Sequence, residues 1–217
     1  MKNGEITLFI AKSLSISVTS KNLDEIMKVL KSEKIDWDLF VQISTSQMIL
    51  PALYCNYQKK QLLHLLPNDL VFYMNEITSL NRERNLQITK QIIELNTLLK
   101  QYNVNPIFIK GSGNLIKGLY EDPAERMIGD IDFLVSKNKY DLVSEILLEN
   151  NYKYVSNLGY HFPQFKHHPR LYNEDNIAAV EIHKELVTEK YASEFNYHFI
   201  KNNICLLYTS PSPRDPS

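Results

Sequence analysis

The spacing of apolar residues changes at Pro106, and this change constrains the fold more than any other feature of the chain. Before it, apolar residues recur every three or four positions, as they do along residues 88–99, which is typical of an amphipathic helix. After it, short apolar runs alternate with turns that contain glycine, which indicates strands. The chain is therefore expected to be an α+β protein, with a helical region over residues 1–105 and a small mixed β-sheet core flanked by helices over residues 106–204.

The elements on either side of this change can be placed approximately. The longest helix should begin near Asp69 and end near Tyr102, because the residue before Pro106 disfavours the α region. Shorter helices are expected before it, and Pro51 marks an early turn or a break in one of them. The expected shorter helices cover residues 23–30, 36–43 and 48–57. The expected strands are residues 107–109, 130–135, 152–155 and 178–183, with helices at residues 114–120 and 139–150.

Composition is typical of a soluble globular protein. The 217 residues are 44% hydrophobic and 23% charged, with a formal net charge of -1. This charge argues against bulk electrostatic capture of nucleic acid or anionic membrane, although a local basic groove stays open as an alternative. Lys2 would suit the start of a signal peptide, but Glu5 and Lys12 interrupt any apolar core of one, and no run of about 18 apolar residues offers a membrane span. Cys55 and Cys205 give no disulfide framework and no zinc spacing, so we expect a cytoplasmic protein with no membrane partner.

The last residues differ sharply in composition from the rest of the chain. Residues 205–215 are rich in serine and proline and resemble the in-frame translation of a transposase sequencing adapter. A disordered proline-rich tail is the alternative, since such a composition buries too little apolar surface to fold. We expect the adapter, so residues 205–217 are interpreted as non-native, Cys205 included, and the natural sequence as cut near Ile204.

Asp130 and Asp132 are the first candidates for a chemical site. Residues two apart in a strand project to the same side, which places their Cα atoms about 6 to 7 Å apart. Adjacent carboxylates repel each other, and a hard divalent cation such as magnesium relieves this repulsion. Glu181, on a neighbouring strand, is the candidate third carboxylate of a two-metal site. Alone, an Asp-x-Asp pair is weak evidence, because acidic pairs are common at exposed strand ends.

The turn before this strand makes a phosphate site plausible. Gly111 and Gly113 flank Ser112, and glycines let backbone amides approach a phosphate closely. Ser112 adds a hydroxyl, and Lys110 adds a charge at the end of its strand. A plain strand-to-helix turn and a solvent-reaching lysine are the structural alternatives. The turn is neither a P-loop, which needs a following Gly-Lys-Ser/Thr, nor a Rossmann fingerprint, which needs a third glycine.

Together these residues resemble the nucleotidyltransferase superfamily that includes DNA polymerase β, and in particular a poorly characterised bacterial branch of it. Members of that branch read Lys-Gly, a short helix with Leu and Tyr, an Arg, then Asp-Ile-Asp-Leu-Leu-Val and later Glu-Leu-His-Trp. The matching residues here are Lys110-Gly111, Leu115, Tyr120, Arg126, Asp-Ile-Asp-Phe-Leu-Val at 130–135, and Glu181-Ile182-His183-Lys184. Lys184 departs from the aromatic residue that is usual at its position. The resemblance spans about residues 107–186.

The resemblance implies a metal-dependent transferase. It would move a nucleoside monophosphate from an NTP to a hydroxyl or phosphate acceptor and release pyrophosphate. Asp130 and Asp132 would hold magnesium, with manganese as the alternative ion. Glu181 would complete the metal site or serve as the base for the acceptor.

The resemblance also implies contacts to the nucleotide and classes of acceptor. Lys110, Gly111 and Ser112 would contact the phosphates, and Arg126 would either offset the triphosphate charge or brace the aspartates by an ion pair. Related branches modify antibiotics, tRNA ends or proteins. The acceptor therefore stays open among a small molecule, tRNA and a protein, and an antitoxin or a biosynthetic protein is a candidate partner.

Two other classes of function stay open. One is a non-catalytic nucleotide-binding or regulatory module of the same fold, against which the intact Asp130, Asp132 and Glu181 argue. The other is a structural helical protein whose acidic strand end is incidental. The histidines at 161, 167 and 168 do not have a standard zinc spacing, but His183 would share a strand face with Glu181.

Overall fold

The computed structural model of the protein describes residues 3–15, 20–32, 34–155, 167, 169–187 and 189–203. The chain divides into two compact units. The first comprises Met1–Leu86 and Tyr120–Met127, and the second comprises Gln87–Leu119 and Ile128–Ser217. One long helix, α5 (Asn68–Gln101), contributes residues to both units. Among the helices of the described residues, none is both long and apolar enough to cross a membrane.

The first unit is built from helices, and its fold follows the predicted pattern closely. Before α5 come α1 (Asn3–Leu14), α2 (Ser20–Leu30), α3 (Trp37–Ser46), α4 (Leu50–Lys59) and the 3-10 turn η1 (Leu63–Leu65). Asp36 caps α3 by accepting a 3.0 Å bond from the amide of Leu39, and Pro51 occupies the first turn of α4, where no amide donor is needed. Apolar side chains from α1 to α5 meet in one core around Phe40 and Tyr57.

Polar contacts hold the loop of residues 120–127 on α5 within this unit. Asn81 and Asn85 donate from Nδ2 to backbone carbonyls of the loop at 2.6 to 3.2 Å. Arg82 forms a two-bond ion pair with Asp122, with Nε–Oδ1 at 3.0 Å and Nη2–Oδ2 at 2.7 Å. Asp122 also caps the 3-10 turn η2 (Pro123–Glu125). The loop is therefore fixed by charge and by backbone bonds rather than by apolar packing alone.

The ion pair of Arg82 and Asp122 should make the stability of the first unit depend on pH. The hydrogen bond from Arg82 lowers the pKa of Asp122, and the opposing effect of burial is smaller. Because the folded pKa lies below the unfolded value of about 3.9, the pair stabilises above that pH and its contribution is lost as the pH falls through the folded pKa. Asp122→Asn should lower the free energy of unfolding by about 1 kcal/mol at pH 7 and by less at pH 3.

Trp37, the single tryptophan, lies in the first unit, so its fluorescence during urea unfolding at both pH values measures this effect. Asp24→Asn, at an exposed position of α2, is the matched control and should change neither value. An Asp122→Asn variant that loses the same stability at pH 3 as at pH 7 would contradict the prediction.

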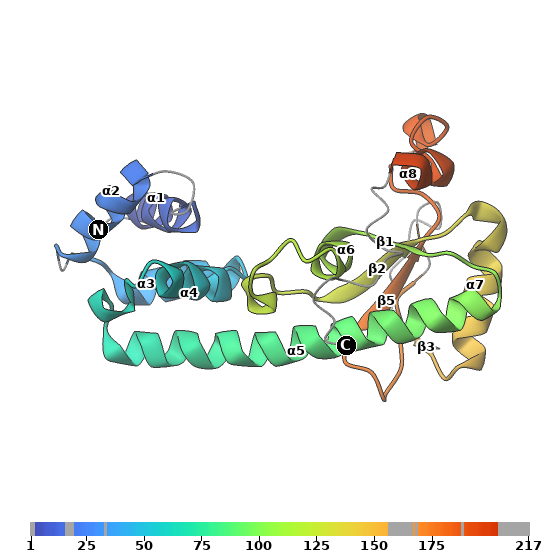
Figure 1. Cartoon of the computed structure of the whole chain (residues 1–217), viewed down its shortest axis with the longest axis horizontal. Coiled ribbons are helices and arrows are strands. Elements are labelled where there is room, and N and C mark those ends of the chain that lie inside the picture. The colour runs from blue at the N-terminus through green and yellow to red at the C-terminus, as the bar shows by residue number, and fades with distance from the viewer. Residues whose placement is uncertain are drawn as a thin grey trace, which may run out of the picture. The chain divides into compact units, whose positions relative to one another are not determined.

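The second unit contains a five-stranded mixed sheet (Figure 1). Its strands are β1 (Ile107–Phe108), β2 (Asp130–Leu134), β3 (Lys153–Tyr154), β4 (Leu171–Tyr172) and β5 (Ala179–His183), in the spatial order β1-β2-β5-β4-β3. The central pair, β2 and β5, is parallel, and every other pair is antiparallel. Side chains alternate along β2 and β5, so Ile131, Phe133, Val180 and Ile182 face one side of the sheet. The predicted acidic residues face the other side, which they share with Leu134 and Ala179.

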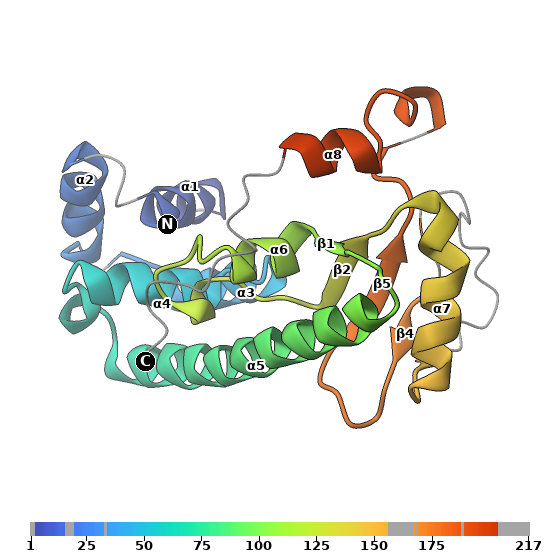
Figure 2. The ribbon, with the colours of Figure 1, turned by 45° about the vertical axis from the view of Figure 1, so that its right-hand side comes forward.

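The apolar face of the sheet is covered by helices. The C-terminal half of α5 and α7 (Tyr140–Glu149) lie along it (Figure 2), and Phe133 and Ile182 are fully buried in this core. Gln91 of α5 fixes the chain where β5 begins, because it exchanges two hydrogen bonds with the backbone of Ala178 at 2.8 and 3.1 Å. The remaining elements are α6 (Lys110–Ile116), α8 (Tyr197–Asn203) and the 3-10 turns η3 (Lys137–Lys139) and η4 (Glu189–Tyr191).

The structure confirms the predicted α+β class and differs in detail at the glycine turn. The helix expected from residue 114 begins at Lys110, so the glycines lie inside α6 rather than before it. The sharp turn is made by Lys110, whose φ of 53° is left-handed. Space is tight at Gly111, since a Cβ there would approach Cγ1 of Ile128 to 3.3 Å and the Ile128 side chain would have to shift. Residues 205–217 lie outside the described residues, and the predicted boundary at residue 105 falls inside the second unit.

Candidate active site

The acidic residues predicted for the site lie on the two central parallel strands. Asp132 of β2 is in register with Glu181 of β5, so both carboxylates lie on one side of the sheet. His183 shares that side, with Nε2 at 2.8 Å from Oδ1 of Asp132 and 3.6 Å from Oε2 of Glu181. All three residues are buried, and one ligand atom from each lies within 4.8 Å of the others. The expectation that His183 shares a face with Glu181 is confirmed.

Two half-exposed basic side chains balance this negative charge. Lys110 Nζ lies 2.6 Å from Oδ1 of Asp132 and 3.7 Å from Oε2 of Glu181. Arg170, just before β4, places Nη2 at 2.8 Å from Oδ2 of Asp130 and Nε at 2.8 Å from Oε1 of Glu181. Arg170 therefore bridges two carboxylates that stand on different strands. Each cation still reaches solvent, since about half of its side chain is accessible.

Ser112 holds the backbone of Asp132 in place. Its Oγ lies 2.7 Å from the carbonyl of Ile109 and 2.9 Å from the carbonyl of Asp132, and it accepts a 3.2 Å bond from the Asp132 amide. The amide of Ile109 donates to the same Asp132 carbonyl at 3.0 Å. The fully buried hydroxyl thus joins the start of α6 to β2 at the position of the key carboxylate. A contact between Ser112 and a phosphate stays a prediction.

The charges at the site shift the pKa values of its members. The close polar contact with His183, and then the hydrogen bond from Arg170, hold the pKa of Glu181 well below its usual range despite burial. Burial lowers the pKa of His183, but its bonds to Asp132 and Glu181 outweigh burial and the net shift is upward. Burial and the charges of Asp132 and Glu181 raise the pKa of Asp130. The environment therefore favours an ionised Glu181 and added positive charge near it.

The candidate residues fit a divalent cation. Carboxylate oxygens suit magnesium and manganese, and an imidazole nitrogen suits several divalent ions. Asp132, Glu181 and His183 converge closely enough to share one ion, and burying two carboxylates side by side is costly without a cation between them. Asp130 falls outside this group of three, so its role as a metal ligand stays a prediction, as does the identity of the ion.

The structure pairs Asp130 with a different arginine from the one considered in the sequence. Arg126 lies in the first compact unit with an exposed side chain, and within the described residues that side chain makes no ion pair. Arg170 makes the pair instead, and no local motif marks it. Only the pairing of β4 with β5 could have identified it. Leu171 is in antiparallel register with Val180, and this register sets Arg170 opposite Glu181.

The histidine-rich segment is described only in part. His161 and His168 lie outside the described residues. His167 forms an isolated bridge with His183, and the centroids of the two rings lie 5.1 Å apart. The ring planes are tilted by 52°, and this contact helps to fix the orientation of the His183 ring against Asp132 and Glu181, called the acidic pair below.

Comparison with known proteins gives a family for the chain. Residues 33–204 match the model of a family described as uncharacterised nucleotidyltransferase. The searches of curated proteins and of solved structures gave no match. The matched segment includes Lys110, the acidic pair and His183, and it covers well over half of the sequence. The protein therefore belongs to this family of uncharacterised nucleotidyltransferases.

Proposed function

We propose that the protein is a metal-dependent nucleotidyltransferase that transfers a nucleoside monophosphate from an NTP to a hydroxyl or phosphate acceptor. The observation that carries the proposal is the in-register pair of Asp132 and Glu181, buried beside His183 in a chain of this family. In the reaction, an acceptor oxygen forms a bond to the α-phosphorus, and the bond from that phosphorus to the bridging oxygen of the β-phosphate breaks. Pyrophosphate leaves, and the proton of a hydroxyl acceptor passes to water.

The acidic side chains would bind the divalent ion that neutralises the reacting phosphate. Magnesium or manganese, held by Asp132 and Glu181 with Asp130 as the predicted further ligand, would supply neutralisation of the triphosphate and activation of the acceptor oxygen. A ligand role suits Glu181 better than a base role, because both of its oxygens already face cationic groups. His183 fixes Asp132 through its 2.8 Å contact and so orients the acidic pair.

The two half-exposed cations are placed to receive the triphosphate. Lys110 acts as a point charge beside Asp132, and the planar fork of Arg170 suits two oxygens of one phosphate. Both cations now neutralise carboxylates, and a bound metal ion would take over that role and free them for phosphate oxygens. Gly111, Ser112 and Arg126 stay predicted nucleotide contacts.

Removal of the metal tests this function. Calorimetry with each NTP should show binding in the presence of magnesium and none after addition of EDTA, because the acidic pair repels a triphosphate without the ion. Incubation with an α-labelled NTP and a small-molecule, tRNA or protein fraction should then release pyrophosphate and label the acceptor. NTP binding that is equally strong in EDTA, or absent from the folded full-length protein, would refute the proposal. Magnesium-dependent binding without transfer to any fraction would favour the non-catalytic module.

A further inference from the structure

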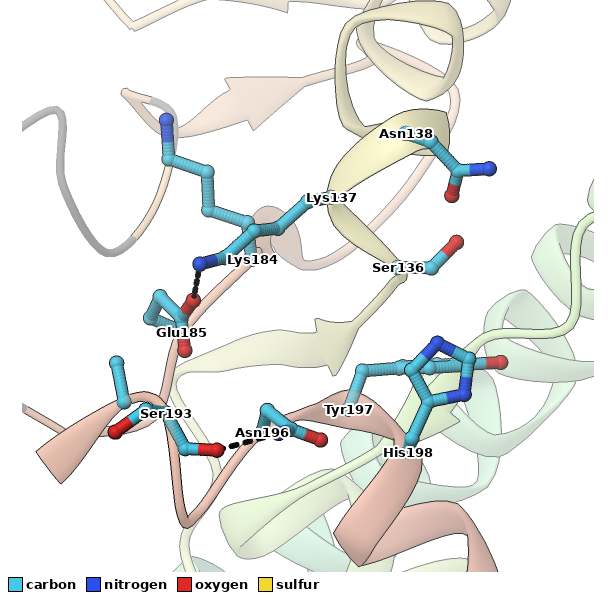
Figure 3. A pocket seen from close by; sticks show the side chains of 10 residues that line it. Ser136, Lys137, Asn138, Lys184, Glu185, Ser193, Asn196, Tyr197 and His198 are labelled. Carbon is cyan, nitrogen blue, oxygen red and sulfur yellow. Dashed lines mark hydrogen bonds and ion pairs between the residues drawn. The ribbon is translucent and has the colours of Figure 1, made fainter.

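A second polar site lies beyond the carboxyl ends of the two central strands. A cavity of about 380 Å³ is walled by the turn after β2, the turn after β5 and the segment that leads into α8 (Figure 3). Lys137 and Glu185 meet on one side of it, and Tyr197 and His198 lie on the other. Glu185 follows His183 by two residues, so their Cα atoms are at most about 7 Å apart. The cavity therefore adjoins the chain segment that carries the acidic site.

Glu185 is the feature that marks this cavity as a binding site. Its side chain is only 1% exposed. Oε1 lies 2.5 Å from Nζ of Lys137, a close charge contact, but neither Oε1 nor Oε2 has a hydrogen-bond partner among the described residues, and Oε2 has no charge contact there either. A buried carboxylate oxygen without a donor is costly, and native proteins seldom leave one unsatisfied. Because Glu185 lines the cavity, its unsatisfied Oε2 could accept a hydrogen bond from a ligand that brings a donor, such as an amine or a hydroxyl.

A neighbouring cavity extends the site and differs in charge. It has a volume of about 310 Å³ and shares Ser136, Asn138, Tyr197 and His198 with the first cavity. Its outer wall includes Lys139 and Lys201, for which the described residues supply no ion-pair partner. The hydroxyl of Tyr197 donates to the carbonyl of Asn105 at 2.9 Å, and this bond anchors α8 beside the two cavities. The two cavities therefore adjoin and are called the cleft below: Glu185 lies in the first with Lys137 and Lys184, and Lys139 and Lys201 lie in the second.

We propose that this cleft binds the acceptor of the transfer, and that the acceptor is a small molecule carrying both an amino group and an anionic group. The amino group would donate to Oε2 of Glu185, and the anionic group would face Lys139 and Lys201. A small molecule fits better than tRNA or a protein surface, because Glu185 is buried inside a cavity of a few hundred Å³. This assignment rests on the proposed nucleotidyl transfer.

Aminoalkyl phosphates of two, four and six carbons are suitable probes, since they carry both groups at graded distances. Calorimetry with the full chain should show binding of at least one of them, and weaker binding of alkyl phosphates and alkylamines of the same length. Glu185→Gln should weaken the binding of the aminoalkyl phosphate at least about tenfold and leave the affinity for the alkyl phosphate unchanged. Lys201→Gln should weaken the binding of both phosphate probes. Because Lys201 is exposed, this substitution should leave the fold intact. Glu149→Gln and Lys100→Gln, both exposed in the same unit, are the matched controls.

The same samples separate this inference from the proposed function when magnesium-NTP binding is measured beside the probes. Asp132→Asn should lose NTP binding and keep binding of the aminoalkyl phosphate. Glu185→Gln should keep NTP binding and lose binding of the aminoalkyl phosphate. If no probe binds while NTP does, the cleft assignment fails and the proposed function stands. If Glu185→Gln loses NTP instead, the cleft is part of the nucleotide site and the acceptor assignment is overturned. If probes bind but NTP never does, the acceptor role falls together with the proposed function.

Discussion

Replacing Asp132 by asparagine is expected to reduce nucleotidyl transfer at least about a thousandfold while leaving the fold intact. The carboxylate is buried, in register with Glu181, and contacts both Lys110 and His183. Asparagine keeps the shape but removes the charge that attracts a divalent ion, so both metal binding and triphosphate positioning should fail. The measurement is the rate of pyrophosphate release from an NTP with saturating magnesium, together with a circular dichroism spectrum of the variant.

Asp175→Asn is the matched control for this variant. Asp175 lies on the exposed turn that joins β4 to β5 in the second unit, it makes no ion pair within the described residues, and its replacement should leave the rate unchanged. A rate for Asp132→Asn within about tenfold of the wild type would show that this carboxylate does not hold the metal, and the catalytic assignment of the acidic pair would then be wrong.

The largest effect on stability is expected at Phe133. This side chain is fully buried on central strand β2 and packs against Phe108, with the ring centroids 5.7 Å apart. Phe133→Ala removes most of a large apolar side chain and leaves a cavity that the surrounding sheet and helices fill only in part. The free energy of unfolding of the second unit should fall by about 3 to 5 kcal/mol. Urea unfolding followed by circular dichroism, with hydrogen exchange of the β2 and β5 amides, measures the loss.

Leu148→Ala provides the comparison on a helix of the same unit. Leu148 is 40% exposed on α7, so its truncation should cost no more than about 1 kcal/mol. A Phe133→Ala variant no less stable than Leu148→Ala would mean that the sheet core is not the main source of stability in this unit.

Much of the fold could be predicted because its signals are local. The period of a strand placed Asp130 beside Asp132 and Glu181 beside His183 on one side of their strands, and the proline at 106 marked the end of α5 within a few residues. The prediction missed β4, since a two-residue strand carries almost no periodicity of its own. It also missed α8, a short helix near the end of the described residues.

The candidate site was less predictable where its geometry depends on distant pairing. Asp132 and Glu181 could be proposed from strand alternation, but their exact neighbours could not. The pairing of Arg170 with Asp130 spans forty residues of sequence and follows from the antiparallel register of β4 with β5. The buried, unsatisfied Oε2 of Glu185 depends on how the turns after β2 and β5 and the segment that leads into α8 enclose it, which no single segment encodes. The left-handed turn at Lys110 was assigned to glycine, because few other residues adopt that conformation without support from their surroundings.

The register of β2 with β5 ties the proposed metal site to correct assembly of the sheet. A slip of one residue between these strands would carry Phe133 or Ile182 to the site face and a carboxylate into the apolar core. A chain with all its strands formed but wrongly paired would therefore have no place for a metal ion. Titrating the metal-binding sites in a preparation should thus count the molecules whose sheet is correctly assembled, which a spectrum of secondary structure alone does not reveal.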